Sequence, residues 1–364
     1  MLLPGTLPTQ RVSRGDGPVR QLPERAADIL SVPLTRYDGT PATVADVLAD
    51  THTDAYAVAH DGAVVACEGS AEPQALLSIT KSIVGCVAGI LVDRGQLDLG
   101  VPVTKYVPEL ADSGYAAATV EHVLDMRSGV RFREDYADPE SEIRRLDSWL
   151  AERHGLYEFL KGLQAEAPHG SRFLYRSAES DVLGWVCERA AGAPMAELVS
   201  SLVWAPLGAE RDAEFLTDAH GTAVHDGGLV MTARDLLRFG NLLLAGGAVP
   251  DGTQVIPPLW LRRAWAVDAD ARNAFLTSPA EAAFPGGWYR SQFWFRPGPS
   301  GDVLLCLGIH GQMLHVCRRT RTVCVKFSSW PDAQHPAYLQ DTLRAFDAIG
   351  ATYAPRRGST IFTR

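Results

Sequence analysis

The sequence is poor in lysine and holds no long apolar run. Only four of the 34 cationic residues are lysines, and the 34 face 43 Asp and Glu, which gives a net charge of −9. An acidic chain without a basic block argues against a nucleic-acid partner. No apolar run is long enough to cross a bilayer or to act as a signal peptide, so we expect a cytoplasmic protein with no membrane partner.

Several motifs of metal and nucleotide sites are also missing. The six cysteines form no CxxC pair and the ten histidines form neither HxH nor HExxH, so we expect no metal site. The absence of GxSxG argues against an α/β-hydrolase, and the absence of GxGxxG and of a P-loop gives no support for a nucleotide. We therefore expect no cofactor.

Hydrophobic periodicity predicts a β-rich start and end around a helical middle. Residues 55–59 and 63–67 flank a His-Asp-Gly turn and predict a hairpin, whereas residues 1–50 predict little regular structure. A buried helix is predicted from Ser78 to Arg94, ended by Gly95. The other predicted elements are helices over 120–126, 148–164, 182–191, 195–204 and 233–244, strands over 291–296, 303–309, 313–318 and 322–328, and a last helix over 335–349.

These elements predict an α/β (α+β) fold in which one antiparallel sheet is flanked by helices. At 364 residues, with 46% hydrophobic residues, the chain has material for one or two domains. The hairpin and the C-terminal strands would meet in an α/β region of residues 1–136 and 250–364. Residues 137–249 would form a mostly helical region.

The sharpest local signal is Ser78-Ile79-Thr80-Lys81 at the start of the predicted buried helix. Positions i and i+3 share a helix face, so the serine hydroxyl and the lysine amine can meet where free N–H groups would stabilise an anion. A serine attacks only when a base takes its proton, and lysine can be that base if burial lowers its pKa from ~10.4 toward about 7. A serine cap followed by an ordinary helix lysine is the alternative.

Two later segments supply groups that this chemistry needs. Tyr175 lies where a loop enters a helix and could pass a proton to a leaving group, although most tyrosines there serve in packing. The segment from Gly308 through Ile309 and His310 ends a predicted strand, where an exposed amide could stabilise an oxyanion. A plain hairpin turn would produce the same glycines.

The order SxxK, Tyr-x-Ser and strand-HxG resembles the serine β-lactamase and penicillin-binding-protein superfamily. The segments Glu134-Asp-Tyr136, Gly308-Ile-His-Gly-Gln312 and Phe327-Ser-Ser-Trp-Pro-Asp332 are similar to the 6-aminohexanoate-dimer hydrolases. These are nylon-oligomer-degrading relatives of carboxylesterases with a β-lactamase fold. The likeness runs from about residue 54 to 347.

The resemblance implies a role for each matching residue. Ser78 would be the acylated nucleophile, Lys81 its base and Tyr175 the proton carrier, with the amides of Ser78 and Ile309 holding the oxyanion. Tyr136 would hydrogen-bond the substrate, Asp147 would pair with its ammonium group and Trp294 would form an aromatic wall. Asp226 and His310 would also border the pocket. For Asp226, a turn-forming role is an equal alternative.

The sequence departs from penicillin-binding proteins in the strand near its C-terminal end. His310-Gly311 stands where they carry Lys-Thr-Gly, which removes the anchor for a β-lactam carboxylate. We therefore expect a serine hydrolase that cleaves an amide or ester of a small linear acid through an acyl-enzyme. An acyltransferase, a D-amino-acid peptide hydrolase and a non-catalytic ligand-binding relative are the alternatives, and a homodimer is left open.

Overall fold

The computed structural model describes residues 5 and 7–354 and is built on a seven-stranded antiparallel sheet. Its strand order is β5-β4-β13-β12-β11-β10-β9. The strands span Ala63–Gly69 (β5), Thr53–His60 (β4), Thr322–Ser328 (β13), Gln312–Cys317 (β12), Val303–Gly308 (β11), Phe293–Arg296 (β10) and Trp288–Arg290 (β9). The predicted hairpin and the pairing of N-terminal with C-terminal strands are confirmed, because β4 pairs with both β5 and β13.

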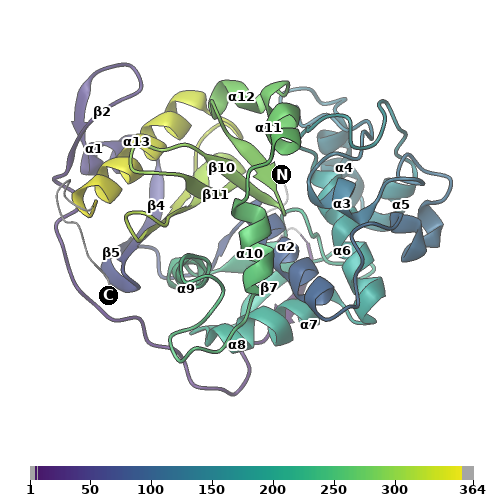
Figure 1. Cartoon of the computed structure of the whole chain (residues 1–364), viewed down its shortest axis with the longest axis horizontal. Coiled ribbons are helices and arrows are strands. Elements are labelled where there is room, and N and C mark those ends of the chain that lie inside the picture. Colours follow the sequence, from purple (N-terminus) through teal and green to yellow (C-terminus); the bar gives the residue numbers. More distant parts are fainter. Residues whose placement is uncertain (1–4, 6, 355–364) are drawn as a thin grey trace.

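Helices cover both faces of this sheet, so its central strands are buried on both sides, whereas the end of edge strand β5 is exposed (Figure 1). On β13, Val323, Val325 and Phe327 pack in the core shared with α2 (Ile79–Asp93) and α9 (Ala233–Leu244). Cys324 lies on the other face, in the core shared with α1 (Val44–Asp50) and α13 (Pro336–Thr352). The alternation follows from the two-residue period of a strand.

The helical region lies at the right and bottom of Figure 1, with α3–α6 at the right and α7 and α8 at the bottom. It contains α3 (Val120–Leu124), α4 (Glu142–Ala151), α5 (Leu156–Lys161), α6 (Ser177–Ala191), α7 (Met195–Val199), a π-helical turn η3 (Ser200–Trp204) and α8 (Ala205–Leu207). The prediction of one helix over 148–164 is wrong. The chain breaks at Arg153, which has a left-handed φ of 66°, and the Trp149 indole donates to the Gly155 carbonyl across the turn at 2.8 Å.

The expectation of little regular structure over residues 1–50 is also wrong in part. This segment forms β1 (Thr9–Val12), the pair β2 (Pro33–Thr35) and β3 (Pro41–Thr43), and α1. Helix α1 begins with a capping box, in which Thr43 and Asp46 satisfy one another's main-chain N–H groups.

A second, four-stranded sheet was not predicted, and it positions the site. Its order is β1-β7-β8-β6, with β6 (Gln74–Ala75), β7 (Ala213–Leu216) and β8 (Leu229–Met231). Strand β6 ends just before Ser78 and β8 begins just after Asp226, and the Leu76 N–H donates to the Leu229 carbonyl at 2.8 Å. This sheet therefore joins the predicted nucleophile to the loop that carries Asp226.

Three short helices complete the fold beside β9 and β10: α10 (Pro258–Trp265), α11 (Ala269–Leu276) and α12 (Ala280–Ala283). Three 3-10 turns connect elements in the described part of the chain: η1 (Val103–Lys105), η2 (Pro108–Leu110) and η4 (Ile309–Gly311). Within the described part of the chain, every helix is too short or too polar to span a membrane.

Candidate active site

Ser78 and Lys81 meet at the first turn of α2, as the SxxK spacing predicts. The Lys81 amine donates to the Ser78 hydroxyl at 2.8 Å, and the lysine side chain is only 1% exposed. The preceding Leu77 has a left-handed φ of 48°, a strained conformation for a bulky residue. The Leu229 N–H donates to the Thr80 hydroxyl at 3.1 Å, so strand β8 holds this turn in place.

Lys81 lies among carboxylates. Its amine donates to the main-chain carbonyl of Asp226 at 2.6 Å and is 3.5 Å from the carboxylate of the same residue. Burial alone would lower the pKa of Lys81, but the Tyr175 phenol and the carboxylates of Asp226, Glu134 and Asp181 together raise it above its usual value. The raised pKa favours the cationic form of Lys81 at rest, so burial alone does not meet the condition under which this lysine would act as a base.

Tyr175 completes the cluster from the other side of Ser78. Its phenol hydrogen-bonds the Ser78 hydroxyl, and its ring centroid lies 5.4 Å from the Lys81 amine. Burial raises the pKa of Tyr175, against the opposing effect of Lys81, so the phenol is protonated at rest. The Leu174 N–H donates to the Met126 carbonyl at 3.1 Å and fixes the segment just before α6.

Two main-chain amides face the same region. Among the described residues, neither the Ser78 nor the Ile309 N–H donates to a hydrogen-bond acceptor, whereas the His310 N–H donates to the Ala333 carbonyl at 2.9 Å. Gly308 brings these amides together, because a Cβ there would lie 2.6 Å from the Leu76 carbonyl oxygen. The end of β11 can thus approach the segment that precedes Ser78, and the two free amides can serve as an oxyanion hole.

The predicted pocket residue His310 is held by the loop after β13. Its Nδ1 lies 2.7 Å from the Trp330 carbonyl, and its backbone has a left-handed φ of 58°. The structure therefore gives His310 a part in shaping the turn that carries Ile309.

Trp294 lies in an aromatic cluster that forms a wall beside Tyr175. The two rings stack with centroids 5.0 Å apart and an interplanar angle of 29°. Phe173, Tyr289 and Phe284 pack around Trp294 with centroids 5.7, 5.0 and 5.6 Å away. Such a wall suits the apolar stem of a linear acyl group.

Tyr136 and Asp147 approach the cluster from the helical region. The Tyr136 hydroxyl donates to Glu134 at 2.9 Å, and the other Glu134 oxygen accepts from the Ser177 N–H at the start of α6. Burial raises the pKa of Asp147, and Asp226 raises it further, so the two carboxylates share one negative region. Arg144 pairs with Asp147 at 3.2 Å on the outer side.

Two site residues, Glu134 and Asp181, were missed as functional groups in the sequence. Burial raises the pKa of both carboxyl groups, and Asp181 accepts from the Asp226 N–H at 3.0 Å. Asp181 is fully buried on α6, directly before the apolar run Val182-Leu183, which was the only local signal for it. Their closeness to Lys81 depends on tertiary contacts that no local pattern contains.

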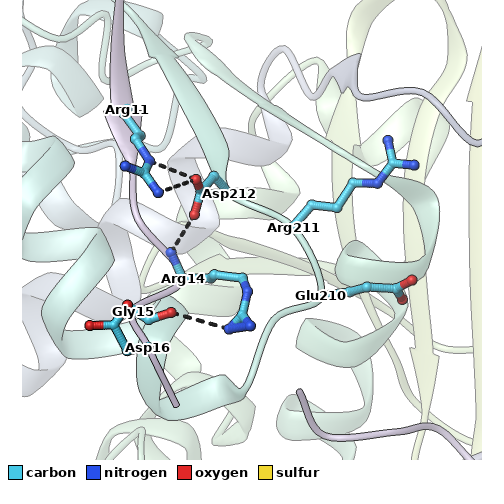
Figure 2. Close-up of a pocket in the computed structure, with 7 residues that line it drawn as sticks. All are labelled: Arg11, Arg14, Gly15, Asp16, Glu210, Arg211 and Asp212. Atoms are coloured by element: carbon cyan, nitrogen blue, oxygen red, sulfur yellow. Dashed lines mark hydrogen bonds and ion pairs between the residues drawn. The ribbon is translucent and has the colours of Figure 1, made fainter. Parts of the chain in front are cut away.

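Figure 2 shows a cavity of about 490 Å³ in another part of the molecule. Arg11 and the Arg14 N–H both bind the Asp212 carboxylate, at 2.6 and 2.9 Å, while Arg211 points away from them. The residues that line this cavity are Arg11, Arg14, Gly15, Asp16, Glu210, Arg211 and Asp212. None of the SxxK cluster takes part, so this depression is separate from the candidate active site.

Among the described residues, no group of three or more His, Cys, Asp or Glu could hold a metal ion.

Comparisons with known proteins agree with this geometry. A family model described as Beta-lactamase matches residues 42–347. The 6-aminohexanoate-dimer hydrolase of Paenarthrobacter ureafaciens is 38% identical over 365 residues, which cover 94% of this chain and 89% of that protein.

Two solved structures share the fold. A candidate 6-aminohexanoate-dimer hydrolase from Bacillus anthracis has a TM-score of 0.84 at 24% identity, covering 96% of this chain and 93% of that one. EstCE1, described as a hydrolase with promiscuous acyltransferase activity, has a TM-score of 0.65 at 18% identity, covering 83% and 96%. The predicted fold class is thus confirmed, and the chain belongs to the beta-lactamase family as a serine hydrolase.

Proposed function

We propose that this chain cleaves amide or ester bonds of small linear substrates through an acyl-enzyme on Ser78. The observation that carries the proposal is the 2.8 Å contact between the Lys81 amine and the Ser78 hydroxyl, beside two amides free to hold an oxyanion. The Ser78 oxygen attacks the carbonyl, and the oxyanion rests on the Ser78 and Ile309 amides. Water then hydrolyses the acyl-enzyme ester on Ser78 and releases the acid.

The protons move within the cluster of Ser78, Lys81 and Tyr175. The reactive state holds one proton fewer than the resting pair of cationic Lys81 and neutral Tyr175, so that one of these groups can take the Ser78 proton. Tyr175 touches both partners and can deliver that proton to the leaving amine or alcohol. Because the carboxylates stabilise the extra proton, the reaction is expected to accelerate toward alkaline pH.

Charge supports a preference for substrates that bear an ammonium group. Glu134, Asp181 and Asp226 lie around Lys81, and Asp147 adds a fourth carboxylate beside Asp226, so acidic groups outnumber Lys81 and Arg144 and the region favours cations over carboxylates. The Paenarthrobacter relative is named for the 6-aminohexanoate dimer, which makes linear aminoalkanoyl amides the first class to test. Tyr136 would hydrogen-bond the amide, Asp147 would pair with the ammonium, and Trp294 would pack on the alkyl chain.

The test compares p-nitrophenyl acetate and butyrate with the linear 6-aminohexanoate dimer. Ser78→Ala should abolish turnover of all three, and intact-mass measurement after a fluorophosphonate should show labelling of the wild type alone. Asp147→Ala should lose dimer cleavage while keeping ester turnover. Unchanged turnover in a folded Ser78→Ala variant would overturn the proposal, and dimer cleavage unaffected by Asp147→Ala would overturn the ammonium pairing.

Acyl transfer uses the same nucleophile and is the second candidate, supported by the shared fold of EstCE1. Adding an alcohol to the ester assay distinguishes the two, since a transferase forms the new ester in preference to the free acid. A cytoplasmic location and a homodimer stay predictions.

A further inference from the structure

The chain contains a second fully buried lysine that the proposed reaction does not use. Lys326 lies on β13, and its amine donates to the Thr51 carbonyl at 3.0 Å and to the Ser328 hydroxyl. Its cross-strand partners, Tyr56 and Met313, belong to the core under α1 and α13, on the sheet face opposite α2. Lys326 therefore cannot touch a substrate at Ser78.

One line of contacts leads from Lys326 to the oxyanion turn through Ser328. The Ser328 N–H donates to the Gln312 side chain at 3.3 Å, and the Gln312 amide donates back to the Ser328 carbonyl at 2.6 Å. The same Gln312 amide donates to the His310 carbonyl at 3.2 Å. Gln312 thus joins the end of β13 to the turn that presents the Ile309 N–H.

A second line runs through Thr51 and Trp330. The Trp330 indole donates at 2.9 Å to the same Thr51 carbonyl that Lys326 binds, and the Trp330 N–H donates to the His310 carbonyl at 3.2 Å. The indole also packs directly on the turn, because a Cβ at Gly311 would lie 2.3 Å from it. Both lines end on the backbone of the three-residue turn η4.

We propose that Lys326 is a positioning residue that sets the Ile309 amide for the oxyanion, through Ser328, Thr51 and Trp330. The proposal rests on the proposed function, since it assigns that amide a catalytic task. A lysine suits the place because one flexible amine reaches the Thr51 carbonyl, just after α1, and the Ser328 hydroxyl on β13 at once.

The bonds matter here more than the charge. Burial lowers the pKa of Lys326 to about 7, against a smaller opposing effect of Asp54. A neutral amine still has two N–H donors, which is enough for both bonds. Burying the Lys326 amine costs folding free energy, and this amine binds no substrate. Its role is therefore to hold the turn that carries Ile309.

The test is Lys326→Met, which keeps the shape of the side chain and removes its donors. For p-nitrophenyl butyrate, kcat should fall about tenfold, less than the loss of a whole oxyanion donor, while KM stays within twofold. A boronic acid inhibitor, whose tetrahedral adduct occupies the oxyanion hole, should bind about tenfold more weakly. Cys324→Ala is the matched control, because it perturbs the same face of β13 without contacting this network, and it should lower Tm alone.

Trp330→Phe provides a second route if Lys326→Met fails to fold. It keeps a ring on Gly311 and removes the bond to Thr51, so the same loss of kcat and inhibitor affinity is expected. Wild-type kcat and inhibitor affinity in a folded variant would overturn this inference alone. Absence of both ester turnover and fluorophosphonate labelling in the wild type would instead overturn the proposed function.

Discussion

The two buried lysines have nearly the same immediate contacts and opposite acid–base behaviour. Lys81 donates to a serine hydroxyl and to the Asp226 carbonyl, 5.4 Å from the Tyr175 ring, and Lys326 donates to a serine hydroxyl and to the Thr51 carbonyl, 5.5 Å from the Trp330 ring. Yet the pKa of Lys81 lies above its usual value and that of Lys326 is lowered to about 7.

Neighbouring acidic groups make the difference. Tyr175 and the carboxylates of Asp226, Glu134 and Asp181 together outweigh the burial of Lys81, whereas only Asp54 opposes burial at Lys326. Burial therefore does not by itself set the charge of a lysine, and the sequence argument for a neutral amine describes Lys326 better than the lysine of the SxxK motif.

The largest effect is expected from Lys81→Met. Activity toward p-nitrophenyl butyrate should fall by about 10²–10⁴, since a proton-transfer group is lost. The free energy of unfolding should fall by about 3–5 kcal/mol, because buried carboxylates lose their cation. Steady-state kinetics and urea unfolding measure the two, and a variant as stable as wild type would show that those carboxylates are neutral in the folded protein.

Lys326→Met should have the opposite effect on stability. Between pH ~7 and ~10.4 the unfolded chain binds a proton that the folded chain does not, so wild-type stability gains up to about 1.4 kcal/mol for each pH unit. The variant lacks this gain, and its advantage over wild type should be greatest below pH 7 and shrink as pH rises. Urea unfolding from pH 6 to 9 tests this, with the exposed Lys161→Met as control.

Asp226→Asn should move the pH dependence of activity. Without that carboxylate the Lys81 cation is less stable and its pKa is lower. The ascending limb of kcat/KM against pH should therefore shift to lower pH by about one unit. Glu121→Gln, at a partly exposed glutamate bound to Arg263, serves as control. An unmoved limb would mean that Asp226 acts on Lys81 through its carbonyl alone.

The smallest effect is expected at Arg144, a partly exposed partner of Asp147. An exposed ion pair contributes up to about 1 kcal/mol, so Arg144→Ala should lower KM for the linear dimer two- to fourfold at most. Ester turnover should not change, and neighbouring Arg145→Ala should leave both unchanged. A raised KM would mean that Arg144 orients Asp147 toward the ligand.

Local patterns predicted the elements whose periodicity is long and clean. Helix α9 was predicted with its observed bounds, and the strands around β11–β13 match closely, because apolar alternation and turn residues delimit them. The break near Arg153 is marked in the sequence only by Gly155, the N-cap of α5, and the prediction of one helix ran past it. Strands β6 and β8 have two and three residues, which is too short for a period to appear.

In the candidate active site, too, local contacts could be predicted from the sequence and long-range contacts could not. Ser78 and Lys81 share a helix turn, so spacing alone predicted their contact, which the structure shows at 2.8 Å. Glu134, Asp181 and the network behind Ile309 depend on contacts between segments far apart in the chain. The charge of Lys81 could not be predicted for that reason, since the acidic groups around it come from other elements.

The close approach of Gly308 to Leu76 has a consequence for biosynthesis. The two amides of the candidate oxyanion hole are separated by more than half of the chain, and the second belongs to the turn η4 that follows β11. During synthesis Ser78 is therefore made long before Ile309. The paired amides can form only after the chain has been synthesised past residue 309 and Gly308 has packed against Leu76.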